Sequence, residues 1–496
     1  MLFSEMIESI KEQILEALNL TDFEPHRLCY DSRYVESGDV FFAIKGFISD
    51  GNRFIGGAFS KGAMAVVTDS ETLFSDSRVL HVKDVRKAMA LMSAKFYGNP
   101  SSKLKIIGIT GTNGKTTISS LIYHILSLNG IKSGLIGTNG NIINNRFIKT
   151  SYTTPESIDL QKLLKEMADE NVECVAIEVS SHSLALNRVY GIDFDIAVFT
   201  NLTTDHLDFH RDMDNYLKSK KVLFDSLKRI NTKNYKTIAF YNSDDIYGSK
   251  IVSGSEAEHM SYGMESGSYK CKYYEMDFTG TKFKLLVPRN GENVSEISVK
   301  MNLTGKFNIY NVIAAIAASK STGLHYEQIV NAIKEFNPVD GRFNQLKLKN
   351  GSIAIVDYSH TPDSLINALV TIREIMNDMK SKGRIITVFG CGGNRDRTKR
   401  PMMGDIAAHY SDIAIVTSDN PRDEDPFEII NEIKSGINKD NYMIIENRED
   451  AIRNAIDMSD KNDVILVAGK GHETYQEIKG IKHHFSDREI IEKYGK

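Results

Sequence analysis

Residues 108–117, with the sequence GITGTNGKTT, decide the fold of the region around them. An apolar run over residues 104–109 precedes this stretch, and apolar residues at helical spacing follow it as far as Gly130. A glycine-rich turn between a strand and a helix directs several backbone N–H groups at one point, where the helix N-terminus adds positive potential. Lys115 can reach the outer phosphates of a nucleotide, and the Thr116 hydroxyl can hold Mg²⁺. The stretch therefore predicts an ATP-binding phosphate loop.

The glycine spacing departs from the general phosphate-loop pattern. That pattern, G-x-x-x-x-G-K-[ST], requires glycine at position 109, where this chain has Ile109, and the glycines are instead Gly108, Gly111 and Gly114. The alternative interpretation is a glycine turn that carries a Lys-Thr pair by chance. The strand before the turn and the helix after it favour the phosphate loop.

Length and composition indicate an ordinary globular protein of several domains. The 496 residues suggest about three domains of ~150 residues each. With 61 Lys and Arg against 65 Asp and Glu, the formal net charge is −4, so no basic excess points to nucleic acid or an anionic membrane. We expect a monomer without a nucleic-acid partner.

Neither the beginning of the chain nor its cysteines indicate export. The first 18 residues have the pattern of an amphipathic helix, with acidic residues every few positions and no continuous apolar run, so they predict neither a signal peptide nor a membrane span. The four cysteines lie far apart and lack metal-ligand spacing, which favours reduced, buried thiols. We therefore expect a cytoplasmic protein.

The pattern of apolar runs predicts an α/β protein of three domains. Residues 1–101 form a small α/β domain, and the turn-rich stretch 97–102 ends it. Residues 102–338 form a central domain with a parallel sheet and the phosphate loop. In residues 339–496, strands and helices alternate as in a doubly wound, Rossmann-like domain.

Two polar residues follow predicted strands of the central domain. Glu178 ends the apolar run 172–179, and His206 follows the run 196–199. Because ligands collect at the carboxyl ends of parallel strands, both side chains are expected near the phosphate loop, where they could hold Mg²⁺. The alternatives are a carboxylate that caps a helix and a histidine with a structural hydrogen bond.

Other polar residues have no decided role from pattern alone. Lys220 lies in a predicted helix, 214–224, and its spacing predicts a solvated surface charge. Asn308 and Asn311, at the start of another predicted helix, could read a base edge or cap that helix.

Several motifs in order resemble those of the Mur ligases, ATP-dependent enzymes that extend the peptidoglycan stem peptide by one amino acid at a time. The motifs are GTNGKTT at 111–117, EVSSH at 178–182, NL at 201–202, DHLD at 205–208 and DNPR at 419–422. Together they look like the members that add the third residue. The resemblance covers nearly the whole chain and implies addition of meso-diaminopimelate to UDP-N-acetylmuramoyl-L-alanyl-D-glutamate.

The resemblance also implies residues for the nucleotide and the metal. ATP would contact Gly111, Thr112, Asn113, Gly114, Lys115, Thr116, Thr117, Asn308, Arg342 and Asp357. Mg²⁺ would be held by Thr116, Glu178, His206 and Lys220, the last as a carbamoylated lysine whose added carboxylate is the ligand. The catalytic residues implied are Lys115, Glu178, His206 and Lys220.

The two other substrates are assigned by the same resemblance. Ser32 and the loop 47–49 would hold the uridine nucleotide, and Thr153, Thr154, Ser180, Leu186 and Arg188 the muramoyl dipeptide. Leu186 stands where many relatives have Gln, and Phe47-Ile48 replaces a commoner polar pair. Diaminopimelate would contact Arg395, Asp419, Asn420, Pro421, Arg422, Gly469 and Glu473. Arg422 can pair with its distal carboxylate, and Glu473 can accept its ammonium.

The implied reaction begins when the D-glutamate γ-carboxylate attacks the γ-phosphate of ATP and forms an acyl phosphate. The amino group of diaminopimelate then attacks the acyl carbon, and phosphate leaves. Near alternatives are a ligase that adds L-lysine and a folylpolyglutamate synthetase. The distant alternative is a nonenzymatic nucleotide switch that changes shape on binding ATP.

Overall fold

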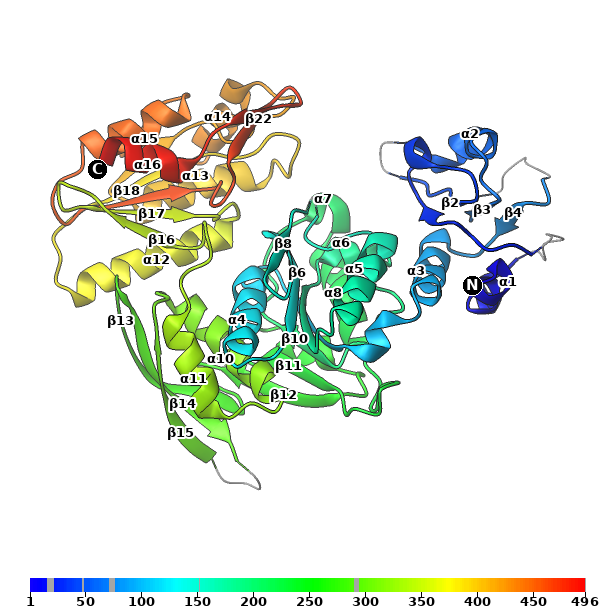
Figure 1. Cartoon of the computed structure of the whole chain (residues 1–496). Coiled ribbons are helices and arrows are strands. Elements are labelled where there is room, and N and C mark those ends of the chain that lie inside the picture. Colours follow the sequence, from blue (N-terminus) through cyan, green and yellow to red (C-terminus); the bar gives the residue numbers. More distant parts are fainter. Residues whose placement is uncertain (16–21, 47–48, 71–75, 151, 290–293, 496) are drawn as a thin grey trace.

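The computed structural model describes residues 1–15, 22–46, 49–70, 76–150, 152–289 and 294–495. It has an α/β architecture, as the sequence predicts, with three main sheets of 4, 11 and 6 strands that follow one another along the chain (Figure 1). None of its described helices is long and apolar enough to cross a membrane.

The first unit is a small parallel sheet with helices around it. Its order is β1-β2-β3-β4, and every neighbouring pair is parallel. The elements are α1 (Phe3–Glu8), β1 (Leu28–Cys29), β2 (Val40–Phe42), α2 (Ile55–Ser60), β3 (Ala65–Thr68), β4 (Val79–His81) and α3 (Val85–Phe96). Short 3₁₀ turns lie at Lys11–Gln13, Ser32–Tyr34, Gly51–Phe54 and Pro100–Lys103.

The N-terminal helix is shorter than its amphipathic pattern predicts. Helix α1 ends at Glu8, and residues 16–18 of the predicted helix lie outside the described residues. Ile14 forms an isolated β-bridge with Val82 beside the sheet. Local periodicity cannot reveal this pairing, which comes after the helix has ended and a 3₁₀ turn at Lys11–Gln13 has followed.

The central unit is built on the 11-stranded sheet, in the order β15-β14-β13-β12-β11-β10-β5-β9-β6-β7-β8. Its first half comprises β5 (Lys105–Thr110), α4 (Lys115–Leu128), β6 (Ser133–Gly137), β7 (Gly140–Ile143), β8 (Arg146–Ile148), α5 (Ser157–Asp169), β9 (Cys174–Glu178), α6 (Ser181–Ala185) and β10 (Ile196–Phe199). Then follow α7 (Leu207–His210), α8 (Met213–Asp225), β11 (Ile238–Asn242), α9 (Gly248–Val252), β12 (Glu258–Gly263), β13 (Tyr269–Asp277), β14 (Gly280–Pro288), β15 (Val294–Met301), α10 (Lys306–Lys320) and α11 (Tyr326–Glu335).

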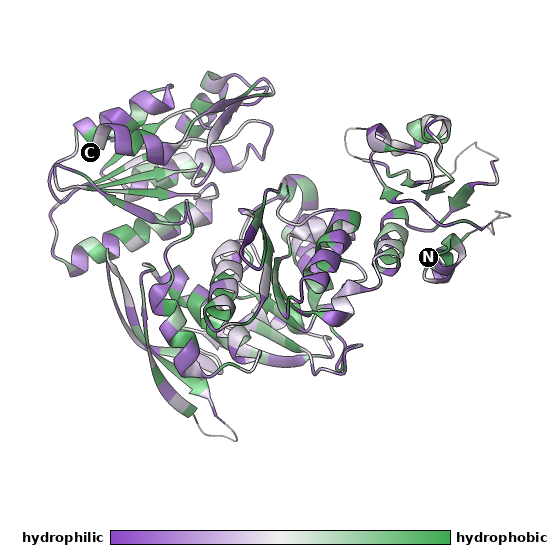
Figure 2. Ribbon diagram, in the orientation of Figure 1, coloured by the Kyte–Doolittle hydropathy of each residue, from purple (hydrophilic) through white to green (hydrophobic). Residues whose placement is uncertain are grey.

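Strand β5 lies between β9 and β10, and all three are parallel. Its side chains alternate between the two faces of the sheet. Ile107 and Ile109 belong to a hydrophobic cluster that includes residues of α4, α10 and α11, whereas Ile106 belongs to a second cluster with residues of α5 and α8. Figure 2 shows the hydrophobic strands enclosed between amphipathic helices. This packing holds the carboxyl ends of β5, β9 and β10 at one edge.

The last unit has a six-stranded sheet in the order β16-β17-β21-β18-β19-β20, in which only β16 pairs antiparallel within the described chain. Its elements are β16 (Asn344–Lys347), β17 (Ile353–Asp357), α12 (Pro362–Asp378), β18 (Ile385–Phe389), α13 (Lys399–Tyr410), β19 (Ile413–Val416), α14 (Pro426–Lys434), β20 (Tyr442–Ile444), α15 (Arg448–Asp457), β21 (Val464–Ala468), the hairpin β22 (Tyr475–Ile478) and β23 (Ile481–His484), and α16 (Asp487–Gly495).

A buried ion pair supports the end of β21, from which a polar loop departs. The side chains of Arg448 and Asp487 are both 0% exposed, with Nε–Oδ1 and Nη2–Oδ2 distances of 2.7 and 2.8 Å. Arg448 Nη2 also donates to the carbonyl of Ala468, the last residue of β21, at 2.9 Å. The pair therefore connects α15 and α16 to the strand end that positions this loop.

Arg448→Met should destabilise the C-terminal unit by about 3–5 kcal/mol, because it leaves the Asp487 carboxylate buried without its partner. The matched control is Arg453→Met in the same helix, whose side chain is 51% exposed and whose loss should cost at most about 1 kcal/mol. Calorimetry, together with hydrogen exchange at β21, measures the loss of stability in each of the two variants. Equal effects of the two substitutions would show that the buried pair has no special role.

Candidate active site

The phosphate loop connects β5 to α4 in a conformation that glycine permits. Gly111 and Gly114 have φ values of +150° and +89°, and Lys115 is the first residue of α4. The Lys115 ammonium donates to the carbonyls of Gly111 and Thr112, each at 2.8 Å. Burial lowers the pKa of Lys115, and the nearby Glu178 opposes that shift.

The Glu178 carboxylate, at the end of β9, accepts hydrogen bonds from two threonine hydroxyl groups. Thr116 Oγ1 donates to its Oε2 at 3.0 Å, which confirms the predicted approach of Glu178 to the phosphate loop. Thr138 donates its Oγ1 to the same oxygen at 3.0 Å and its backbone N–H to Oε1 at 2.9 Å. Sequence reasoning missed Thr138, because a threonine in a turn between two strands carries no distinctive signal.

His206 lies at the start of α7 with φ of +54°. Its Nε2 is 3.3 Å from Oδ2 of Asp205, and its ring centroid is 4.8 Å from that of His182. Burial lowers the pKa of His206 to about 3, against the opposing effect of Asp205. The imidazole is therefore uncharged at neutral pH, the form in which it binds a metal ion.

Lys220 is buried, contrary to the solvated charge that its spacing predicts. Its side chain is 1% exposed, and Nζ donates to the Gly111 carbonyl at 2.8 Å. The pKa of Lys220 lies well below its usual value, because burial and the charge of Lys115 both disfavour the ammonium. The helical pattern could not reveal this, since α8 packs this face against the loop.

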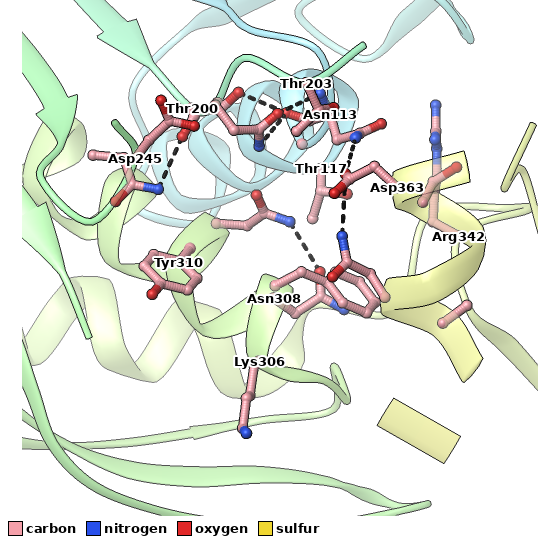
Figure 3. Close-up of a pocket in the computed structure, with 18 of the residues that line it drawn as sticks. Asn113, Thr117, Thr200, Thr203, Asp245, Lys306, Asn308, Tyr310, Arg342 and Asp363 are labelled. Atoms are coloured by element: carbon pink, nitrogen blue, oxygen red, sulfur yellow. Dashed lines mark hydrogen bonds between the residues drawn. The ribbon is translucent and has the colours of Figure 1, made fainter. Parts of the chain in front are cut away.

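A cavity of about 420 Å³ lies beside the phosphate loop, between the central and C-terminal units (Figure 3). Asn113, Gly114 and Thr117 line it from the loop and α4, and Arg342 and Asp357 from the C-terminal side. Further lining residues include Thr200, Asn201, Asn242, Asp245, Asn308, Asn311 and Asp363. Six of the ten nucleotide contacts that the resemblance implies therefore line one cavity, although they are far apart in the chain. Gly111, Thr112, Lys115 and Thr116 are not among its lining residues.

Two hydrogen bonds join the phosphate loop to the C-terminal unit. Asn113 Nδ2 donates to Oδ2 of Asp363, at the start of α12, at 2.9 Å (Figure 3). Arg342 Nη2 donates to Thr116 Oγ1 at 3.4 Å, and its guanidinium lies 4.8 Å from the ring centroid of Tyr358. Both contacts bring groups of the second unit to the phosphate-binding end of the cavity.

Asn308 satisfies part of its hydrogen-bonding capacity within its own helix region. Its Nδ2 donates to the Thr304 carbonyl at 2.8 Å, and its Oδ1 accepts from Asn311 Nδ2 at 3.1 Å (Figure 3). Neither bond caps the helix, because the N-cap residue of α10 is Gly305 and no side-chain cap bond is formed there. The place of Asn308 in the cavity wall keeps a nucleotide contact open. Across the cavity, burial raises the pKa of Asp357, which accepts from the Phe343 N–H at 2.7 Å.

The residues expected at the muramoyl dipeptide form a second polar group next to Glu178. Thr154 Oγ1 donates to the Glu178 carbonyl at 2.7 Å and accepts from the Ser180 N–H at 3.2 Å. Arg188 Nη1 donates to the Thr154 carbonyl at 3.1 Å and pairs with Glu156 at 2.9 Å. Glu156 is a further residue that the sequence did not single out.

The remaining predicted substrate residues are placed as follows. The hydroxyl oxygens of Thr153 and Thr138 are 3.1 Å apart, and Leu186, the C-cap residue of α6, is partly buried. Ser32 lies in the separate N-terminal unit, where its carbonyl accepts from Lys61 Nζ at 2.8 Å. Phe47 and Ile48, of the predicted uridine loop, lie outside the described residues.

The residues expected at diaminopimelate meet between two loops of the C-terminal unit. Asn420 Nδ2 donates to Glu473 Oε2 at 2.8 Å, and Arg422 Nη1 donates to the Gly393 carbonyl at 2.6 Å. Gly469 leaves room that a side chain would fill, since a Cβ there would lie 2.6 Å from Oδ2 of Asp419. Pro421 is buried between these residues, and Arg395 is exposed.

No group of three or more His, Cys, Asp or Glu side chains within the described residues is arranged to hold a metal ion. The donors near the phosphate loop are of another kind: the Thr116 hydroxyl, which donates to the Glu178 carboxylate, and the uncharged imidazole of His206. The two oxygen donors suit Mg²⁺, and a carbamate on Lys220, whose pKa is lowered by burial, would add a further oxygen ligand.

Family models match three consecutive parts of the chain. They are described as Mur ligase family, catalytic domain (residues 24–97), Mur ligase middle domain (109–319) and Mur ligase, glutamate ligase domain (341–471). The chain is also 45% identical over 477 residues to a UDP-N-acetylmuramoyl-L-alanyl-D-glutamate–2,6-diaminopimelate ligase of Clostridium botulinum, with 95% of each chain covered. The chain belongs to the Mur ligase family.

Other relatives agree with this membership. A protein of Clostridium tetani with the same name is 42% identical over 498 residues, which cover 99% of this Mur ligase and 98% of the relative. A solved structure with that name has 31% identity and a TM-score of 0.66, with 95% and 94% of the chains covered. A Mycobacterium tuberculosis folylpolyglutamate synthase complexed with ADP and AMPPCP, 15% identical with a TM-score of 0.61 and coverage of 76% and 91%, shares the fold.

Gly114→Ala should weaken nucleotide binding by at least about tenfold, because a Cβ would lie 2.4 Å from Asn311 Oδ1 in the cavity wall and φ is +89°. Gly130→Ala is the matched control at the other end of α4. Its φ is +76°, yet a Cβ there meets nothing within 4 Å, so it should lower stability and leave nucleotide affinity unchanged. Calorimetric titration with ATP distinguishes them, and equal affinities in both variants would contradict the role of the Gly114–Asn311 approach.

Proposed function

We propose that this Mur ligase uses ATP to join meso-diaminopimelate to the D-glutamate of UDP-N-acetylmuramoyl-L-alanyl-D-glutamate in peptidoglycan precursor synthesis. The observation that carries the proposal is the match, over 95% of both chains, to a relative whose name states this substrate pair. The phosphate loop, the cavity beside it and the Asn420–Glu473 pair supply the kinds of contact that such a reaction needs. The product is an amide, and the reaction proceeds through an acyl phosphate.

The nucleotide would lie in the cavity between the central and C-terminal units. The loop from Gly111 to Thr117 would receive its phosphates, and Arg342, which already reaches Thr116, would add positive charge beside them. Asn308 would contact the adenine, and Asp357 would lie on the phosphate side. Lys115 would leave its two carbonyl partners and turn toward the γ-phosphate, where it stabilises the charge that develops during transfer.

Thr116, Glu178, His206 and a carbamoylated Lys220 would hold Mg²⁺, which supplies charge neutralisation for the phosphates when bound. The chain's own contribution is to keep these donors in place. Thr138 fixes both oxygens of Glu178, and the Gly111 carbonyl orients the Lys220 amine toward the loop. Burial lowers the pKa of Lys220, which favours the uncharged amine, the form that adds CO₂.

The muramoyl dipeptide would lie against Thr153, Thr154, Ser180, Leu186 and Arg188, with its γ-carboxylate directed at the phosphate loop. Glu178 supports this arrangement, because its side chain contacts Thr116 and its carbonyl contacts Thr154. The reacting carboxylate and the phosphate would thus be held by neighbouring groups of one strand end, and positioning of this kind lowers the barrier. Ser32 and the loop 47–49 would hold the uridine nucleotide.

The amino acid would bind between Asp419–Arg422 and Gly469–Glu473, with Arg395 at the exposed rim. Arg422 can form a forked pair with the distal carboxylate of diaminopimelate, and Glu473 can accept its ammonium. The distal end of L-lysine lacks that carboxylate and would leave Arg422 with only its present partners, the Gly393 carbonyl and Glu477. This difference favours diaminopimelate over the alternative substrate.

We also propose that residues 1–101, 102–338 and 339–496 bind the uridine nucleotide, ATP and the amino acid respectively. Closure of the last unit over the central one would bring the amine to the acyl phosphate and exclude water. We propose that the protein is a monomer in the cytoplasm.

Two alternative functions are a folylpolyglutamate synthetase, a member of which shares the fold at low identity, and a nonenzymatic nucleotide switch. The switch would bind ATP and form no amide product.

The activity is tested by a panel of amino acids with ATP and the UDP-linked dipeptide. We expect amide product and stoichiometric ADP with meso-diaminopimelate, and at least about a hundredfold lower kcat/KM with L-lysine, since a site built to pair a charged group strongly rejects a ligand that lacks it. Mass spectrometry of the product checks both. Product with lysine alone would replace the substrate assignment, and ATP binding without any amide would favour the switch.

The modification of Lys220 is tested with ¹³C-labelled bicarbonate and carbon NMR. A carbamate signal is expected in the wild type and in Lys221→Met, but not in Lys220→Met, whose activity should fall at least about a hundredfold. Lys221 is a suitable control because it lies next in the same helix and pairs with Asp225 at 2.7 Å. Because the Lys220 pKa is lowered, its carbamate should form at lower pH than that of an exposed lysine. A signal that persists in Lys220→Met would refute the assignment.

A further inference from the structure

Lys470 is a fully buried lysine in the loop that follows β21. Its side chain is 0% exposed, although it stands between two glycines in a polar stretch. A buried ammonium is costly unless other groups compensate its charge. The reaction proposed above uses no positive charge at this place, so its partners indicate what the lysine does.

The partners of Lys470 are the residues expected to bind the amino acid. Its Nζ lies 3.0 Å from Oε2 of Glu473 and donates to Oδ1 of Asn420 at 3.1 Å. Asn420 Nδ2 donates to the same Glu473 oxygen at 2.8 Å, which closes a ring of three side chains. The Glu477 N–H donates to Asn420 Oδ1 at 2.9 Å and holds the two loops together.

In this ring one carboxylate oxygen of Glu473 is already hydrogen-bonded, and the Lys470 ammonium neutralises the charge of Glu473. Oε2 receives both the Lys470 ammonium and the Asn420 amide, so a ligand is left with Oε1. An amino acid that ends in a single ammonium would find a carboxylate already neutralised. One that ends in both an ammonium and a carboxylate would still gain from Arg422, whose guanidinium is 21% exposed at the same loop.

We infer that Lys470 is a specificity-determining residue of the amino-acid site: its buried ammonium pairs with Glu473 and so disfavours amino acids whose side chain ends in a lone positive charge. The inference rests on the proposed function and adds a source of discrimination that is independent of Arg422. Arg422 strengthens the binding of a ligand with a distal carboxylate, whereas Lys470 weakens the binding of a ligand whose distal end carries a net positive charge. Lys470 contacts Glu473 and acts through it.

The test is the ratio of kcat/KM for meso-diaminopimelate to that for L-lysine in Lys470→Met and Lys470→Gln. Both substitutions remove the positive charge of Lys470. Lys470→Gln also keeps a hydrogen-bond donor for Glu473, so it serves as the test variant if Lys470→Met does not fold. The ratio should fall at least about tenfold, because the unbalanced carboxylate attracts a cationic ligand more than a neutral zwitterionic end. The KM values for ATP and the UDP-linked dipeptide should stay within about twofold, which a general structural defect would not allow.

Two further variants make the measurement specific. Lys482→Met is the matched control, because Lys482 is exposed on β23 and lies beside the same aromatic ring as Lys470. The Nζ atoms of Lys482 and Lys470 lie 4.1 and 5.7 Å from the Tyr475 ring centroid. Loss of the Lys482 charge should leave the kcat/KM ratio unchanged. In Lys470→Met/Glu473→Gln both charges are absent, so the ratio should return toward the wild-type value.

An active wild type with an unchanged ratio in both Lys470 variants would overturn the inference. So would a double variant that discriminates no better than Lys470→Met. A wild type that forms amide with neither amino acid would instead overturn the proposed function, so the two failures are distinguishable.

Discussion

The phosphate loop depends on one close approach between two strand ends. Gly111 has no side chain, and a Cβ there would lie 1.8 Å from Oγ1 of Thr200, the residue after β10. That hydroxyl donates to the Asn113 carbonyl at 2.6 Å, and the Asn201 side chain accepts from the Asn113 N–H at 2.9 Å. The loop is therefore held against the neighbouring strand end. Every other group of the site is placed relative to this contact.

The same contact sets the electrostatics of the site. Gly111 directs its carbonyl at two lysines, the partly buried Lys115 and the buried Lys220, which both donate to it at 2.8 Å. Burial lowers the pKa of both, and the charge of Lys115 lowers the pKa of Lys220 further. Glu178 lies on the other side, where the Thr116 hydroxyl and the Thr138 N–H donate to its carboxylate. The site thus places a lysine of lowered pKa and a hydrogen-bonded carboxylate within one small region, as the proposed carbamate and metal ligation require.

The C-terminal unit completes the site without sharing its sheet. Asp363 and Arg342 reach the phosphate loop across the cavity, while Asn420, Lys470 and Glu473 form a separate polar ring on the same unit. The first contacts are single hydrogen bonds, weak enough to break and re-form as the units move. In the ring, Asn420 and Lys470 are buried, Glu473 is partly exposed, and the charges of Lys470 and Glu473 compensate each other. The proposed amino-acid site is thus held by contacts within one unit, whereas the cavity is spanned by contacts between two units.

The sequence by itself determined the local features of this protein. Residues 108–117 predicted the strand, the glycine loop and the helix, and alternating apolar runs predicted the α/β class and the Rossmann-like last unit. The motif resemblance supplied the family. These predictions succeeded because backbone conformation and periodic burial depend on neighbouring residues.

Only the tertiary structure decided which side chains are buried and what they contact. The helical pattern predicted a solvated Lys220, and no sequence signal singled out Lys470, yet both side chains are buried in the folded chain. Thr138 gave no sequence signal, and nor did the pairing of Ile14 with Val82 after the N-terminal helix. Burial and long-range pairing depend on residues far away in the chain, and such contacts set the charge state and the selectivity of a site.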